Sequence, residues 1–71
     1  MNMTPVKSSN IESIGYDEKT GTLAVKFKGS GQTYHYDKVP KDAHTEMLKA
    51  PSVGKFLNQH IIGKHAHKKV G

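Results

Sequence analysis

The most regular pattern of apolar and polar positions lies in the segment TLAVKFK, residues 22–28. Leu23, Val25 and Phe27 are apolar at every second position, and the residues between or after them are Ala24, Lys26 and Lys28. Successive side chains of a strand point to opposite faces of the sheet. The alternation therefore predicts a strand with one buried and one solvated face.

A further strand is predicted before it, over residues 11–16, where Ile14 and Tyr16 share a face. Ile11 is out of phase with these two residues, and we expect a β-bulge to restore the alternation. The polar segment DEKTG, residues 17–21, has the length and the terminal glycine that are typical of a hairpin loop. The tripeptide GSG, residues 29–31, predicts a second turn.

The third predicted strand, residues 33–37, carries two tyrosines one residue apart. Its alternation places Tyr34 and Tyr36 on one face and leaves Thr33 and His35 on the other. Tyrosines on a sheet can stack nucleic-acid bases, or they can belong to the core. We favour the core, because Thr33 and His35 are poor core residues and a chain this small needs every apolar side chain.

Two short amphipathic helices are predicted after the strands. Pro40 ends the third strand and suits the first position of a helix in which Ala43 and Met47 share a face. Ser52 is expected to cap the second helix. The second helix has an apolar stripe at spacings of three and four residues, made by Val53, Phe56, Leu57, Ile61 and a partly buried His60.

The expected architecture is α+β: a three-stranded antiparallel β-meander followed by two short α-helices packed on one face of the sheet. A chain of 71 residues has room for one core. We expect that core to unite Leu23, Val25, Phe27, Val53, Phe56, Leu57 and Ile61. The expected divisions are a flexible N-terminus over residues 1–7, the domain over 8–63 and a basic C-terminal tail over 64–71.

Lysine dominates the charge of the chain. Eleven lysines, no arginine and six acidic residues give a formal charge of +5. This excess favours polyanionic partners, because each phosphate contact releases counterions, but lysine does not read base edges as arginine does. The charge therefore indicates affinity rather than sequence specificity, and the solubility of a small domain is the other explanation for it.

Several function classes find no support in the sequence. There is no cysteine, which excludes disulfides and thiolate catalysis. No segment approaches the roughly 20 apolar residues of a membrane helix, and MNMTPVKSSN lacks the apolar part of a signal peptide. His60, His65 and His67 have no cysteine or acid nearby to complete a metal site. We expect a soluble cytoplasmic protein that is not an enzyme and has no cofactor or metal.

The segments SSNIESIGYD, TLAVKF, TYHY, VP and APSVGKFLNQHI, in this order, resemble the KTSC domain family. That family is named after the C-terminal region of lysyl-tRNA synthetase, where some members form an appendage, and other members are small bacterial or phage proteins. Its central tyrosine-x-tyrosine motif corresponds to Tyr34 and Tyr36. The resemblance implies a single-domain bacterial or phage member with an RNA-binding role. This chain departs from the family pattern at Ile62, where a basic residue is expected, and at three positions where aromatic residues are common: His44, His65 and His67.

Two functions are left open. The first is a small binding module for RNA or another nucleic acid, acting through a lysine-rich surface made by Lys26, Lys28, His35, Lys55, Lys64, Lys68 and Lys69. Lysines on a sheet face also guard against edge pairing, so this surface has a purely structural explanation as well. The alternative is a protein–protein interaction module that uses a sheet edge or the second helix around Lys55, Asn58 and Ile62.

Overall fold

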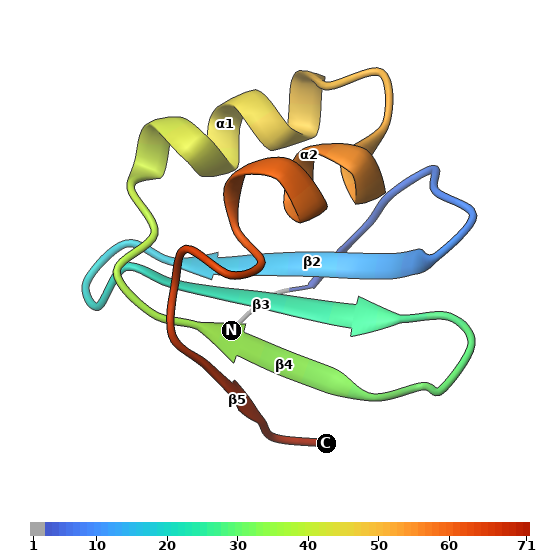
Figure 1. Ribbon diagram of the computed structural model, residues 1–71, viewed down its shortest axis with the longest axis horizontal. Helices are drawn as coiled ribbons and strands as arrows, with labels where there is room; N and C mark the ends of the chain where they lie inside the picture. Colours follow the sequence, from blue (N-terminus) through green and yellow to red (C-terminus); the bar gives the residue numbers. More distant parts are fainter. Residues whose placement is uncertain (1–2) are drawn as a thin grey trace.

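The computed structural model describes residues 3–71 of the chain. Over these residues the chain forms one sheet of five strands, with two helices packed on one face of it (Figure 1). The elements are β1 (Thr4–Pro5), β2 (Ile11–Asp17), β3 (Thr22–Phe27), β4 (Thr33–Tyr36), α1 (Lys41–Lys49), α2 (Val53–His60) and β5 (His67–Lys69). The predicted α+β class, with an antiparallel sheet and two helices, is confirmed.

The predicted number of strands is wrong. The sheet has the order β1-β2-β3-β4-β5, and all neighbours are antiparallel. Strand β1 lies in the segment expected to be a flexible N-terminus, of which residues 1–2 are outside the described residues, and β5 lies in the expected C-terminal tail. Both strands are short and exposed, so they carry no hydrophobic alternation that a sequence pattern could detect.

The predicted bulge in β2 is confirmed. The register between β2 and β3 shifts between Ile11 and Ser13, with Glu12 as the extra residue. This shift returns Ile11 to the same side of the sheet as Ile14, and both side chains are fully buried. The bulge therefore allows a strand with an irregular apolar pattern to contribute two isoleucines to one core.

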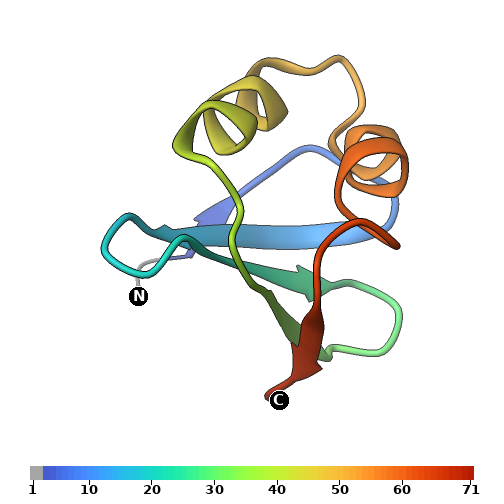
Figure 2. The same ribbon diagram turned by 60° about the vertical axis from the view of Figure 1, so that its left-hand side comes forward.

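The core lies between the sheet and the two helices (Figure 2). Its buried residues are Ile11, Ile14, Leu23, Val25, Tyr36, Val39, Met47, Val53, Leu57 and Ile61. Phe27 and Phe56, which were expected inside, are only partly buried and pack against this cluster. His60 is exposed rather than partly buried, because α2 ends at this residue and Ile61 fills the core instead.

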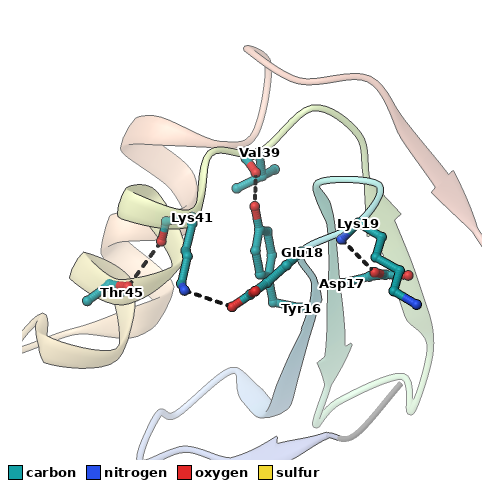
Figure 3. Close-up of polar contacts among 7 residues, drawn as sticks. All are labelled: Tyr16, Asp17, Glu18, Lys19, Val39, Lys41 and Thr45. Atoms are coloured by element: carbon teal, nitrogen blue, oxygen red, sulfur yellow. Dashed lines mark hydrogen bonds and ion pairs between the residues drawn. The ribbon is translucent and has the colours of Figure 1, made fainter.

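Three contacts join the β2–β3 hairpin to the segment between β4 and α1 and to the start of α1. Figure 3 shows those of Tyr16 with Val39 and of Lys41 with Glu18. The Tyr16 hydroxyl donates to the carbonyl oxygen of Val39, and the Val39 N–H donates to the carbonyl oxygen of Gly21 at 2.8 Å. The Lys41 Nζ lies 2.9 Å from the Glu18 Oε1. Both backbone polar groups of the buried Val39 thus have partners, which fixes where α1 begins above the sheet.

The two helices are short, and their N-terminal ends differ. Ser52 caps α2 as predicted, since its Oγ accepts a hydrogen bond from the Lys55 N–H at 3.3 Å. Pro40 stands one residue before α1 and makes no side-chain cap. Neither of these helices, within residues 3–71, has the length and apolar character that crossing a membrane requires.

Candidate nucleic-acid interface

The sheet face opposite the helices, called here the outer face, gathers basic residues from three adjacent strands. Residues that pair across strands lie on the same side of a sheet. His35 of β4 pairs with Ala24 of β3 and with Lys68 of β5, and Lys26 pairs with Thr33 in the next row. Paired residues have Cβ atoms about 4.5–5.5 Å apart. His35 and Lys68 are therefore direct neighbours, while Lys26 is a diagonal neighbour of His35 at about 7–8 Å. These three residues of the outer face are called the basic cluster below.

Lys26 also has an acidic neighbour. Its Nζ lies 3.2 Å from the Glu12 Oε2, and the two side chains are 41% and 52% exposed. Exposed ion pairs of this kind contribute only about 0–1 kcal/mol. A phosphate could therefore take the place of the Glu12 carboxylate at little cost in stability.

Two of the predicted lysines lie away from the basic cluster. Lys28 lies one residue beyond the end of β3, outside the paired rows that carry the basic cluster, and its N–H donates to the carbonyl oxygen of Asn10 at 2.8 Å. Lys55 is exposed in the first turn of α2, in the helix layer on the opposite side of the sheet.

The lysines of the predicted tail separate into three places. Lys64 lies in the turn after α2 and lines a hollow with Lys38 and His65. Lys69 pairs with Tyr34, so it is on the helix side of the sheet. Among these three tail lysines, only Lys68 joins the basic cluster.

Strand β5 is hydrogen-bonded to β4 along its whole length. The Asp37 N–H donates to the carbonyl oxygen of Ala66 at 2.9 Å, and the Val70 N–H donates to the carbonyl oxygen of Thr33 at 2.8 Å. The His65 Nδ1 lies 3.0 Å from the carbonyl oxygen of Asp37. These contacts hold the lysines of β5 on fixed sides of the sheet.

Tyr34 and Tyr36 lie on the helix side; Tyr36 is in the core as predicted, whereas Tyr34 is only partly buried against it. Tyr36 is 4% exposed, and this burial raises the pKa of its hydroxyl, with a smaller contribution from Tyr34. Tyr34 is half-buried against the core, and its hydroxyl donates to the Gln32 Oε1 at 3.3 Å. Neither tyrosine faces the basic cluster.

The histidines occupy separate environments. The His44 ring stacks on Tyr16 with 4.8 Å between ring centroids and 13° between planes. Burial lowers the pKa of His44, and the nearby Glu18 carboxylate partly opposes this effect. His60 packs on Phe56, with ring centroids 4.5 Å apart. In the part of the chain that the structure describes, no three histidine or acidic side chains gather to hold a metal ion.

The architecture defines a small α+β domain whose outer sheet face carries the basic cluster. The chain belongs to the KTSC domain family, whose model matches residues 7–65. This match confirms the resemblance that the ordered sequence segments carry.

Individual relatives agree with the family assignment. The crystal structure of a KTSC domain protein from Yersinia pestis superimposes with a TM-score of 0.94 at 41% identity, covering 99% of this chain and 97% of that one. A protein from Tsukamurella paurometabola is 46% identical over 56 residues, which are 79% of this chain and 82% of that protein. A lysine–tRNA ligase from Nostoc punctiforme is 40% identical over 58 residues, 82% of this chain but 10% of the ligase. The chain thus spans about a tenth of the length of that ligase.

Proposed function

We propose that this chain is a small non-enzymatic module that binds RNA through the basic cluster on the outer face. The observation that carries this proposal is the pairing of β5 with β4, which holds Lys68 directly opposite His35. Lys26 of β3 completes the group from the adjacent row. Three basic side chains held by one sheet form a surface that can follow a phosphate backbone.

The residue types favour backbone binding over the reading of a particular sequence. Lysine is a compact point charge that suits phosphate, and the chain contains no arginine to make bidentate contacts to base edges. The formal charge of +5 attracts any polyanion over a distance that salt limits. Affinity should therefore fall steeply with salt concentration.

The relatives favour RNA among the polyanions. Lysine–tRNA ligases are named for their action on a transfer RNA, and a region of the Nostoc punctiforme enzyme is similar to this chain. An appended module that holds RNA would assist such an enzyme. The same surface on a separate small chain would bind RNA independently.

The test compares two double variants that remove the same charge. Lys26→Gln with Lys68→Gln alters the basic cluster, whereas Lys49→Gln with Lys55→Gln removes two exposed lysines from the helix layer. Affinity for a short RNA is measured at several salt concentrations. For a single strand, each lost phosphate contact lowers the slope of log affinity against log salt by about 0.7. In the variant with Lys26→Gln and Lys68→Gln, we expect the slope to decrease in magnitude by about 0.7 for each lysine. In the variant with Lys49→Gln and Lys55→Gln, we expect the slope to stay unchanged.

The same titration, followed by amide NMR shifts, locates the bound strand. Saturable shifts over β3, β4 and β5 are the expected result. Equal losses in both double variants, or shifts spread over lysines on every side of the molecule, would contradict a defined interface on the outer face.

A protein partner is the second candidate, and the helix layer carries the observation that favours it. Leu48 and Ile62 are 46% and 41% exposed, and a hollow next to Leu48 is lined by Pro5, Val6, Lys7, Ala50, Pro51 and Val53. Binding through apolar side chains responds little to salt, in contrast to phosphate binding. Replacing Leu48 and Ile62 with Ser would abolish such an interaction and leave RNA affinity unchanged.

A further inference from the structure

The helix side of β4 and β5 carries an aromatic surface at the edge of the sheet. His67 of β5 pairs with Tyr36, and its exposed ring lies with its centroid 5.7 Å from the ring centroids of both Tyr34 and Tyr36. Tyr34 is half-buried. Its ring and that of Phe27 pack edge to face, with 5.8 Å between the ring centroids and 81° between the ring planes. Of these four rings, only that of Tyr36 is fully in the core.

These rings are neighbours in a surface and do not form a closed stack. The planes of His67 and Tyr34 are tilted by 54°, and those of His67 and Tyr36 by 38°. A flat ligand would therefore lie on the exposed parts of His67 and Tyr34 and could not insert between them. Unpaired nucleic-acid bases are flat groups that stack on tyrosine and histidine in this way.

A positively charged side chain, which can bind a phosphate, lies directly beside this surface. Lys69 is exposed and pairs with Tyr34, so its side chain leaves the strand on the same side as the rings. Lys68, one residue earlier, leaves on the outer face beside His35. The last strand of the sheet thus offers an ammonium group on each of its two sides, with aromatic rings next to one of them.

We propose that Tyr34 and His67 form a platform on which unpaired bases stack, with Lys69 holding the adjacent phosphate, so that the ligand is single-stranded RNA passing around the β5 edge. This inference rests on the proposed RNA binding and specifies the form of the RNA. The basic cluster contacts the backbone on the outer face, and the aromatic surface contacts bases on the helix side. A duplex, whose bases are paired and stacked on one another, uses the first contact and not the second.

The test separates bases from backbone by comparing three probes on the full chain. They are a short single-stranded RNA, an oligomer of the same length that has the ribose-phosphate backbone without bases, and a duplex of the same sequence. The variants are His67→Ala and Tyr34→Leu. The matched control is His60→Ala, because His60 is also exposed and also packs on an aromatic ring, but lies in α2. Circular dichroism and thermal unfolding establish that each variant is folded, and His67→Ala remains decisive if Tyr34→Leu unfolds.

We expect the single strand to bind at least fivefold more tightly than the abasic oligomer, about the smallest ratio that one stacked base supplies. His67→Ala should remove most of that difference and leave affinity for the abasic oligomer unchanged, while His60→Ala should change neither. Ring-proton signals of Tyr34 and His67 should move upfield in the complex, which a merely structural role would not produce.

Two other outcomes overturn the inference in distinguishable ways. If the abasic oligomer and the single strand bind equally and His67→Ala alters neither, stacking is excluded while backbone binding through the basic cluster stands. If none of the three probes binds in a saturable, salt-sensitive manner, the proposed RNA binding fails and the stacking platform fails with it.

Discussion

Tyr34 and Tyr36 share one face of β4, yet Tyr36 is 4% exposed and Tyr34 is only half-buried. Their partners on β3, Leu23 and Val25, are both fully buried, but Tyr36 belongs to the core cluster and Tyr34 only packs against it. Two tyrosines that look equivalent in the sequence should therefore contribute differently to the stability of the fold.

Substituting each tyrosine by alanine should separate their roles. Truncating a buried aromatic side chain costs about 3–5 kcal/mol, and a core of this size supplies only about 3–5 kcal/mol in total. Tyr36→Ala should therefore abolish cooperative urea unfolding, and Tyr34→Ala should fold with a lower midpoint. Equal losses of stability in the two variants would show that the position of each tyrosine in the sheet does not decide its contribution to stability.

The stacked pair Tyr16 and His44 predicts a dependence of stability on pH. Burial lowers the pKa of His44 in the folded chain relative to its ordinary value of 6.5. The unfolded chain then binds the proton more readily, so this contribution to stability is complete above pH 6.5 and is lost as the pH falls below that value through the lowered pKa of the folded chain. Because His44 is only partly buried, the effect should be modest.

The measurement is the midpoint of urea unfolding between about pH 8 and pH 5, the range in which histidine titrates. The native chain should lose stability towards the acidic end. His44→Phe keeps a ring against Tyr16 but cannot be protonated, so its midpoint should fall less over the same range. Identical pH profiles for the two chains would mean that other groups produce the dependence.

The elements that could be predicted from sequence are those whose pattern is local. Leu23 and Val25 repeat every second position and define β3, and the phase error at Ile11 indicates the bulge in β2. Ser52 precedes an apolar stripe and caps α2. Each of these features depends on residues within a few positions of one another, so no knowledge of distant contacts is required.

The candidate site was harder to predict because it depends on β5. Nothing in the segment HKK repeats with a strand period, and its pairing with β4 joins residues more than thirty positions apart, such as His35 and Lys68. The placement of Lys68 on the outer face, and of His67 beside the tyrosines, follows from that pairing alone. Lys26 and His35, which lie on strands that the pattern does predict, were placed correctly on the outer face.

Gly21 and Lys38 both adopt the left-handed backbone conformation, with φ of +72° and +56°. Gly21→Ala should destabilise the chain by about 1–2 kcal/mol, the cost of this conformation for a residue with a Cβ atom. Space is not the obstacle, since the nearest heavy atom to the added Cβ would be the Val39 carbonyl oxygen at 3.5 Å. Lys38→Asn is the counterpart with the opposite sign, because asparagine tolerates this conformation better than lysine. Thermal unfolding should show a lower midpoint for the first variant and a higher one for the second.

The pairing of β5 can be tested with two proline variants that remove the same charge. In an antiparallel pair, the residues whose N–H groups face the partner strand alternate. The Val70 N–H donates to β4 and the Ala66 carbonyl accepts from it, so the Lys68 N–H faces β4 as well, and the Lys69 N–H faces away. Lys68→Pro should therefore break the ladder, whereas Lys69→Pro should be tolerated as proline is on an edge strand.

Hydrogen exchange of the amides of β4 and of Asp37, the residue after it, measures the difference. Lys68→Pro should speed exchange at His35 and at Asp37, since both amides then lose the cover of β5, with a loss of about 0.5–1.5 kcal/mol for each hydrogen bond removed. Lys69→Pro should leave their protection near that of the native chain. If the two variants exchange alike, β5 does not hold Lys68 opposite His35, and the basic cluster has no fixed geometry on which RNA binding could depend.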